Sequence, residues 1–171
     1  MTESPRIADP SSRLRSSRAA IEALRSAVAA RDPWPLAEAF GSEPEASWGP
    51  REVLAHTAEM LPFWLGEYER VVEAGRRPGD PVAFGRTADD ALRIGILERD
   101  RTLPLRELFD RIETGIERWE RRLGEVAAGD GDATGRHSRL GEMTADEIRD
   151  RFVVTHLEDH VRQLEEILGE R

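Results

Sequence analysis

The sequence contains no cysteine and no lysine, so its chemistry must rest on other side chains. Without a thiol the chain has no disulfide, no thiolate metal ligand and no cysteine nucleophile. Without lysine it cannot form a Schiff base, and it lacks the lysine of a phosphate-binding loop. The motifs of serine hydrolases and of dinucleotide-binding folds are also missing. Any thiol chemistry would therefore need a thiol from outside the chain.

Long apolar runs and excess positive charge are absent as well. The charged fraction is 35%, and no segment approaches the roughly 20 apolar residues of a membrane-spanning helix. The first residues lack the apolar core of a secretory signal, so we expect a cytoplasmic protein. The net charge of -9 would repel phosphate backbones, and the arginines are scattered. We therefore expect neither a nucleic acid nor a membrane as a partner.

Apolar residues recur with helical spacing in four segments, and no stretch shows the alternation that is typical of a β-strand. This pattern predicts an all-α protein, a four-helix bundle with a long crossover between its second and third helices. A chain of 171 residues fits one domain, which we place at 12–171 after a flexible N-terminus at 1–11. The expected helices cover about 12–30, 50–74 and 105–127, and the fourth begins after residue 144.

Local signals refine these boundaries. Thr144 and Glu147 form a capping box, in which each side chain satisfies the main-chain N–H of the other at the start of a helix. Pro50 suits the first position of the second helix, because the N–H that proline lacks would have no partner there. Pro62 lies inside the same helix and predicts a kink or a break. The crossover contains a short helical pattern in its second half.

Three histidines are candidate metal ligands. His156 and His160 lie one turn apart in the last helix, and His56 lies in the second. At about 100° per residue, all three fall within the apolar faces of their helices. Two imidazoles one turn apart can bind one ion, and His56 can complete the three ligands of a catalytic metal site. The alternative is three separately hydrogen-bonded core histidines, which would need partners for up to six ring nitrogens, so we favour the metal site.

Other polar residues lie near these positions. Asp159 and Glu59 lie at the edges of the apolar faces, where they could orient the imidazoles or accept a proton during catalysis. Surface carboxylates fit the same pattern equally well. His137, just before the last helix, is interpreted as a solvated loop residue in preference to a fourth ligand. The spacings do not fit the HExxH peptidase motif or the glutamate and histidine pattern of di-iron bundles.

Four segments of the sequence resemble the DinB-like superfamily of helical-bundle metalloproteins, and together they span nearly the whole chain. They are WGPREVLAH (48–56), FGRTADD (84–90), RHSRLGEMT (136–144) and HLEDHVRQL (156–164). The resemblance implies that His56, His156 and His160 bind one divalent metal ion, zinc or nickel. Characterised relatives include S-transferases that use low-molecular-weight thiols such as mycothiol or bacillithiol, and a mycothiol-dependent maleylpyruvate isomerase. The resemblance thus implies an S-transferase that takes a thiol and a small-molecule electrophile, and a homodimer.

Two other functions remain open for the same residues. A three-histidine metal site can also hydrolyse a small ester or amide, and thiol-independent turnover would identify that activity. A non-catalytic binding or stress-response protein would instead hold a structural metal in a closed sphere of four ligands. S-transfer differs from both because its nucleophile arrives with the cosubstrate, which suits a chain that has no cysteine.

Overall fold

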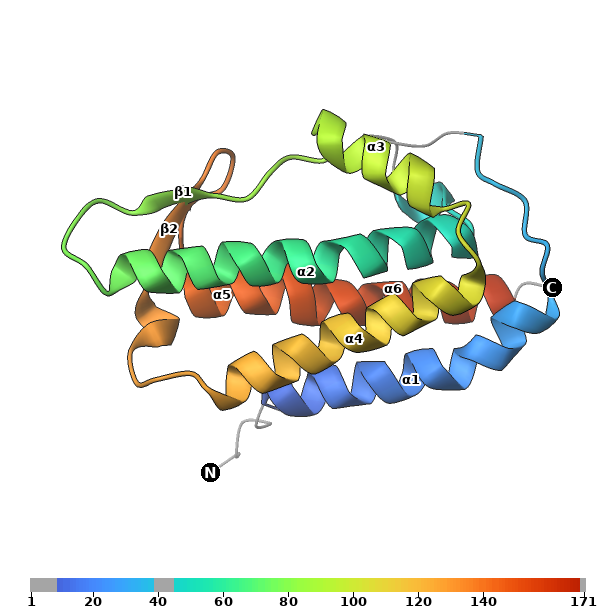
Figure 1. Ribbon diagram of the computed structural model, residues 1–171, viewed down its shortest axis with the longest axis horizontal. Helices are drawn as coiled ribbons and strands as arrows, with labels where there is room; N and C mark the ends of the chain where they lie inside the picture. The colour runs from blue at the N-terminus through green and yellow to red at the C-terminus, as the bar shows by residue number, and fades with distance from the viewer. Residues whose placement is uncertain (1–8, 39–44, 170–171) are drawn as a thin grey trace, which may run out of the picture.

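The computed structural model describes residues 9–38 and 45–169, and this part of the chain is predominantly helical, as predicted. The helical elements are α1 (Pro10–Ala30), α2 (Pro50–Gly75), α3 (Ala91–Asp100), α4 (Leu105–Gly124), α5 (Ala145–Arg149), a π-helical segment (Asp150–Thr155) and α6 (His156–Gly169). The last three form one continuous run, and α3 lies outside the long helices, against α2 (Figure 1). No helix within the described ranges is long and apolar enough to cross a membrane.

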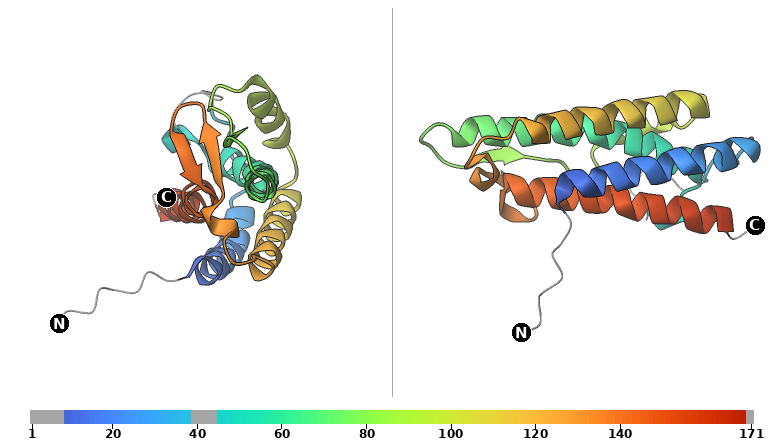
Figure 2. Two further views of the ribbon diagram at one scale, coloured as in Figure 1. Left: turned by 90° about the vertical axis from the view of Figure 1, so that its left-hand side faces the viewer. Right: turned by 90° about the horizontal axis from the view of Figure 1, so that it is seen from below.

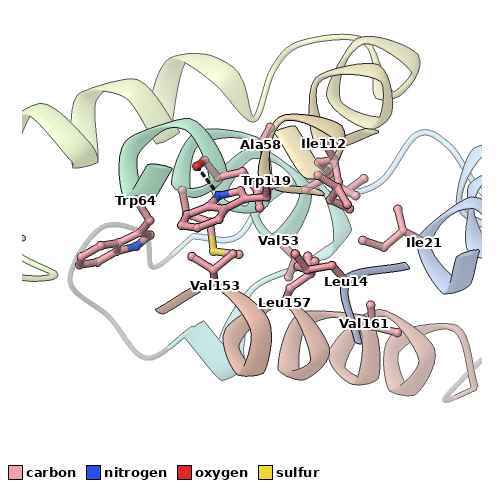
Figure 3. Packing of buried hydrophobic residues seen from close by; sticks show 14 of the residues in the cluster. Leu14, Ile21, Val53, Ala58, Trp64, Ile112, Trp119, Val153, Leu157 and Val161 are labelled. Carbon is pink, nitrogen blue, oxygen red and sulfur yellow. Dashed lines mark hydrogen bonds between the residues drawn. The ribbon is translucent and has the colours of Figure 1, made fainter. Parts of the chain in front are cut away.

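The long helices pack side by side. In the described part of the chain α2 contacts α4, α4 contacts α1, α1 contacts α6, and α6 contacts α2 (Figure 2). Their shared interior contains Trp48, Trp64 and Trp119, each at most 6% exposed. The indole N–H of Trp119 donates to the main-chain carbonyl of Leu61 at 3.0 Å, which joins α4 to α2. Figure 3 shows this bond and the apolar side chains around it.

The helix boundaries follow from the chemistry of their first residues. The Asp9 side chain accepts the N–H of Ser12 at the start of α1. The predicted capping box is confirmed: the Glu147 N–H donates to the Thr144 hydroxyl, and the Thr144 N–H donates to the Glu147 carboxylate. Of the kink or break predicted at Pro62, the break is wrong, because α2 continues through that residue. Pro62 lies on the exposed side of α2, so its ring does not disturb the packing of the core.

A purely α fold is the part of the prediction that fails. A three-stranded sheet consists of β1 (Val82–Phe84), β2 (Thr134–His137) and β3 (Gly141–Thr144). Strand β2 pairs in parallel with β1 and antiparallel with β3, at the end of the molecule where α2 finishes (Figure 1). A Cβ at Gly135 would lie 2.7 Å from Phe84 and Val71, so glycine is required where β2 packs on α2. Strands of three or four residues are too short to show a repeat of two in the sequence.

A pair of glycine substitutions tests the packing of α2 against α4. A Cβ at Gly115 would lie 2.8 Å from the Cβ of Leu61, whereas one at Gly66 would meet nothing within 4 Å. We expect Gly115→Ala to lower the free energy of unfolding by about 1–3 kcal/mol, because overpacking outweighs the gain in helix propensity. Gly66→Ala should raise it by about 0.5–1 kcal/mol. Urea denaturation measures both, and a stabilising Gly115→Ala would contradict the close packing.

Candidate metal centre

The three predicted histidines converge in the interior. Helix α2 provides His56, and α6 provides His156 and His160 from adjacent turns. The Nε2 atoms of His56 and His156 are 3.2 Å apart, and the ring centroids of His56 and His160 are 5.0 Å apart. His56 and His160 are each 3% exposed, while the side chain of His156 is 25% exposed. The three imidazoles therefore share one space, reached from solvent on the His156 side.

The π-helical segment ends directly before His156. A π turn takes in more residues than an α turn, so the residues after it are rotated relative to a regular α-helix. Val153 and Val154 are both buried here, and Phe152 is only partly buried. Figure 3 shows Val153, Leu157 and Val161 directed from this run into the core. A regular α-helix would place Phe152 and His156 on one face, and no residue in the sequence marks this change of register.

Glu45 is the fourth donor at the centre, and sequence reasoning missed it. It begins a short 3-10 helix (Glu45–Ser47) in the connection that precedes α2. One carboxylate oxygen is 3.5 Å from Nε2 of His56, and the other is 3.3 Å from Nε2 of His156 and 3.7 Å from Nε2 of His160. No periodic pattern distinguishes Glu45, which lies outside the long helices. Only the fold brings it to the histidines.

This group of four side chains fits a divalent ion. One potential ligand atom from each lies within 4.8 Å of all the others. A tetrahedral site with bonds of about 2.0–2.1 Å separates its ligand atoms by about 3.3 Å, and four of the pairs of donor atoms already lie 3.2–3.7 Å apart. Nε2 of His160 is buried and has no hydrogen-bond partner among the described residues. A metal ion would satisfy that lone pair, which otherwise lies buried at a cost in free energy.

Burial and repulsion from neighbouring imidazoles disfavour protonation of His56 and His160. Burial lowers the pKa of His56 well below its usual value, and the nearby His160 and His156 lower it further. Burial, followed by the neighbouring His156, lowers the pKa of His160 to about 4. Burial acts to raise the pKa of Glu45, but the hydrogen bond from His156 and the attraction of its basic neighbours, among them Arg93, outweigh it, and the pKa is lowered. Neutral imidazoles and an ionised carboxylate are the forms that bind a metal.

Two residues hold Glu45 in place. Arg93 of α3 is 5% exposed and donates one guanidinium N–H to the Glu45 carboxylate at 3.1 Å and another to the carbonyl of Ala88 at 3.0 Å. Gln163 of α6 donates its amide N–H to the main-chain carbonyl of Glu45 at 2.6 Å. The carboxylate and the main chain of Glu45 are thus fixed from different helices.

The two predicted catalytic carboxylates lie apart from the four donors. Glu59 is buried against Arg86, whose guanidinium stacks on Phe63 at 3.7 Å, and it lines a separate groove of about 670 Å³ between α2, α3 and α4. Asp159 is exposed, pairs with Arg162, and lines the opening beside His156. Neither carboxylate is within hydrogen-bonding distance of an imidazole in the described ranges.

The interpretation of His137 as a solvated loop residue is wrong. It ends β2, is 6% exposed, and stacks on Phe152 with 5.7 Å between ring centroids. Its Nδ1 accepts the N–H of Arg139, and its Nε2 lies 3.4 Å from the carbonyl of Arg86. His137 is outside the group of four donors. It instead supports Phe152, which lines the opening to the centre.

The centre opens to solvent through a depression of about 770 Å³ along α6. Its lining includes Glu45, His156 and His160, with Phe152 on one side and Asp159 and Arg162 at the rim. On the inner side, Trp48 meets the His56 ring edge-on, with 5.4 Å between centroids. The donors are thus buried on one side and accessible to a small molecule on the other.

The sequence profile of the DinB superfamily matches residues 14–164, a range that includes all four donors. No curated protein matches the chain significantly.

The lowered histidine pKa values predict how the stability of the metal-free protein depends on pH. The unfolded chain binds protons at His56 and His160 near pH 6.5, while the folded protein resists them down to about pH 4 at His160. Stability should therefore be unaffected above about pH 7 and fall as the pH drops from 6.5 towards 4, by up to about 1.4 kcal/mol per pH unit for each histidine.

Urea denaturation in the presence of a chelator, at pH values from 7.5 to 5, measures this slope. The variant His160→Phe removes one of the two groups and should show a shallower fall. The variant His137→Phe is the control, because that histidine lies outside the centre. An equal slope in the His160→Phe variant would contradict the assignment.

Proposed function

Because the chain belongs to the DinB superfamily, we propose that it is a divalent-metal-dependent thiol S-transferase. Its substrates would be a low-molecular-weight thiol of the mycothiol or bacillithiol kind and a small electrophile. The observation that carries this proposal is the convergence of His56, His156 and His160 with Glu45 at the base of an open depression. A buried donor set that solvent reaches from one side suits chemistry on a small molecule.

The four donors would hold one zinc or nickel ion. Neutral imidazoles suit both metals, and the carboxylate offsets part of the positive charge. When bound, a divalent ion supplies Lewis acidity, which lowers the pKa of a thiol or water molecule that it coordinates. The absence of cysteine from the chain leaves the external thiol as the sulfur nucleophile.

Residues around the opening would take part in the transfer of the thiol to the electrophile. Asp159 lines the depression and is exposed, so we assign it as the acceptor of the thiol proton. The carbon–sulfur bond would form as the carbon–chlorine or epoxide carbon–oxygen bond of the electrophile breaks. Glu59 lines a separate groove and pairs with Arg86, so we assign it no part in the proton transfer. Phe152 offers an aromatic surface for the apolar part of the electrophile.

One observation favours a second candidate, a non-catalytic protein with a structural metal. Glu45 provides a fourth donor, and four protein ligands can close a tetrahedral site. Glu45 differs from the histidines in that its side chain is 35% exposed and also pairs with Arg93. A carboxylate with a second partner is the donor that an incoming thiol can displace at the lowest cost. We therefore favour the transferase.

Metal analysis tests the centre itself. Protein purified without a tag or a chelator should contain about one zinc or nickel ion per chain by mass spectrometry. His56→Ala and His156→Ala should each lose it, because two remaining imidazoles do not make a tight site. His137→Ala serves as the control and should retain the ion. A wild-type protein without metal after supplementation with both ions would overturn the proposal.

Thiol-transfer assays test the reaction. Mycothiol and bacillithiol are each mixed with chloro- and epoxide electrophiles, and the loss of free thiol is followed together with the thioether product. We expect turnover in the metal-loaded protein only, and a kcat about 100-fold lower in Asp159→Asn with unchanged metal content. Glu158→Gln is the matched control, since Glu158 pairs with Arg13.

Two outcomes would support one of the other functions instead. Ester or amide hydrolysis without a thiol would identify a hydrolase. A tightly held ion that resists chelators, with no turnover for any of these substrates, would identify the structural site.

A further inference from the structure

Gln163 is the only residue with a side-chain amide in the sequence, because the chain has no asparagine and no other glutamine. It lies one turn after His160 in α6, and it is half-buried. Its two polar atoms both face residues of the metal centre. The amide N–H donates to the carbonyl of Glu45 at 2.6 Å, and Oε1 lies 3.1 Å from Nδ1 of His160. A single side chain thus joins a donor on α6 to the donor outside the long helices.

The main-chain carbonyl of Glu45 determines which way this amide points. A carbonyl oxygen can only accept a hydrogen bond, so the Gln163 atom that faces it must be the NH₂ group. The opposite orientation would bring two acceptors to 2.6 Å of each other. The orientation of the Gln163 amide therefore follows from its chemistry, although nitrogen and oxygen have almost the same size.

The amide orientation in turn determines the tautomer of His160. Oε1 of Gln163 has no proton, so Nδ1 of His160 must carry one to bond with it. In a neutral imidazole the other nitrogen, Nε2, then has a free lone pair. Nε2 is the atom of His160 that faces Glu45 at 3.7 Å and lacks a hydrogen-bond partner in the described part of the chain. This tautomer is the one that binds a metal through Nε2.

We propose that Gln163 is the positioning residue that assembles the metal centre, because it fixes the ligand tautomer of His160 and ties the Glu45 turn to α6. The proposal deepens the proposed function and rests on it for the identity of the ligands. His56 shows the contrast: its Nδ1 is buried without a hydrogen-bond partner in the described residues. The only imidazole whose Nδ1 is held by a side chain in those ranges is that of His160.

Two substitutions separate the two bonds. Gln163→Met keeps the length of the side chain and removes both hydrogen bonds. Gln163→Glu keeps an acceptor for the Nδ1 proton of His160 but removes the donor to Glu45. Glu166→Met is the matched control, because Glu166 is exposed and lines the same depression. Far-UV circular dichroism verifies that each variant is folded.

Two measurements are made on each protein. Long-range ¹H–¹⁵N correlation spectra of the metal-free protein report the tautomer of His160. Competition with a chromophoric chelator gives the dissociation constant for Zn²⁺. We expect Nδ1-protonated His160 in the wild type and in Gln163→Glu, and a change towards the Nε2-protonated form in Gln163→Met. The dissociation constant should rise about 10–100-fold in Gln163→Met and by a smaller factor in Gln163→Glu.

The two readouts separate this inference from the proposed function. A Gln163→Met protein with the wild-type tautomer and the wild-type dissociation constant would overturn the role of Gln163. If Gln163→Met does not fold, Gln163→Glu still decides, because loss of the Nδ1-protonated form in that variant would contradict the argument. Wild-type protein that binds no metal would sink the proposed function, yet the tautomer of the metal-free protein would still test Gln163.

Discussion

The candidate metal centre depends on keeping protons off two buried imidazoles, those of His56 and His160. Burial disfavours the charged form of both side chains, and a proton on one imidazole would also repel a proton on its neighbour. Burying neutral nitrogen lone pairs without a partner costs free energy, which a hydrogen-bond donor or a metal ion would offset. Helix packing, the Glu45 turn and the Arg93 ion pair all serve to hold this arrangement. The long helices therefore act as a frame that holds the three imidazoles close together.

The four donors are positioned by elements of different kinds. His56, His156 and His160 lie on long helices whose apolar faces fix them through packing in the core. Glu45 lies on a short turn and depends on hydrogen bonds from α3 and α6. The histidines are therefore positioned by the whole fold, whereas Glu45 is positioned by a few polar contacts. Such a site combines three donors fixed by core packing with one donor fixed by hydrogen bonds.

The sequence allowed the helices and the three histidines to be predicted, and it did so for physical reasons. A helix of 20 residues repeats its apolar face several times, and a capping box such as Thr144 with Glu147 marks its start. The histidines were found because they interrupt an apolar face. Glu45 could not be found in this way, since it lies in a connection with no repeat and reaches the centre only through the tertiary fold.

The sheet and the π-helical segment were missed for related reasons. Strands of three or four residues are too short for an alternating pattern, and His137 therefore read as part of a loop. The π turn changes the register of a helix without a marker such as glycine or proline. Gln163 could be singled out from the sequence in another way, because it is the only residue of the chain with a side-chain amide and it lies three residues after His160. Its rarity, rather than its periodicity, distinguishes it.

The position of Glu45 in the chain has a consequence for the unfolded state. Glu45 and His156 are 111 positions apart in the sequence, yet their side chains meet. An ion held between them would close a loop of more than half the chain. If the ion stayed bound in the unfolded chain, it would reduce the conformational entropy of that chain. If it dissociated, unfolding would cost the free energy of metal binding. A metal at this place would act as a reversible cross-link, comparable to a disulfide in a protein that has no cysteine.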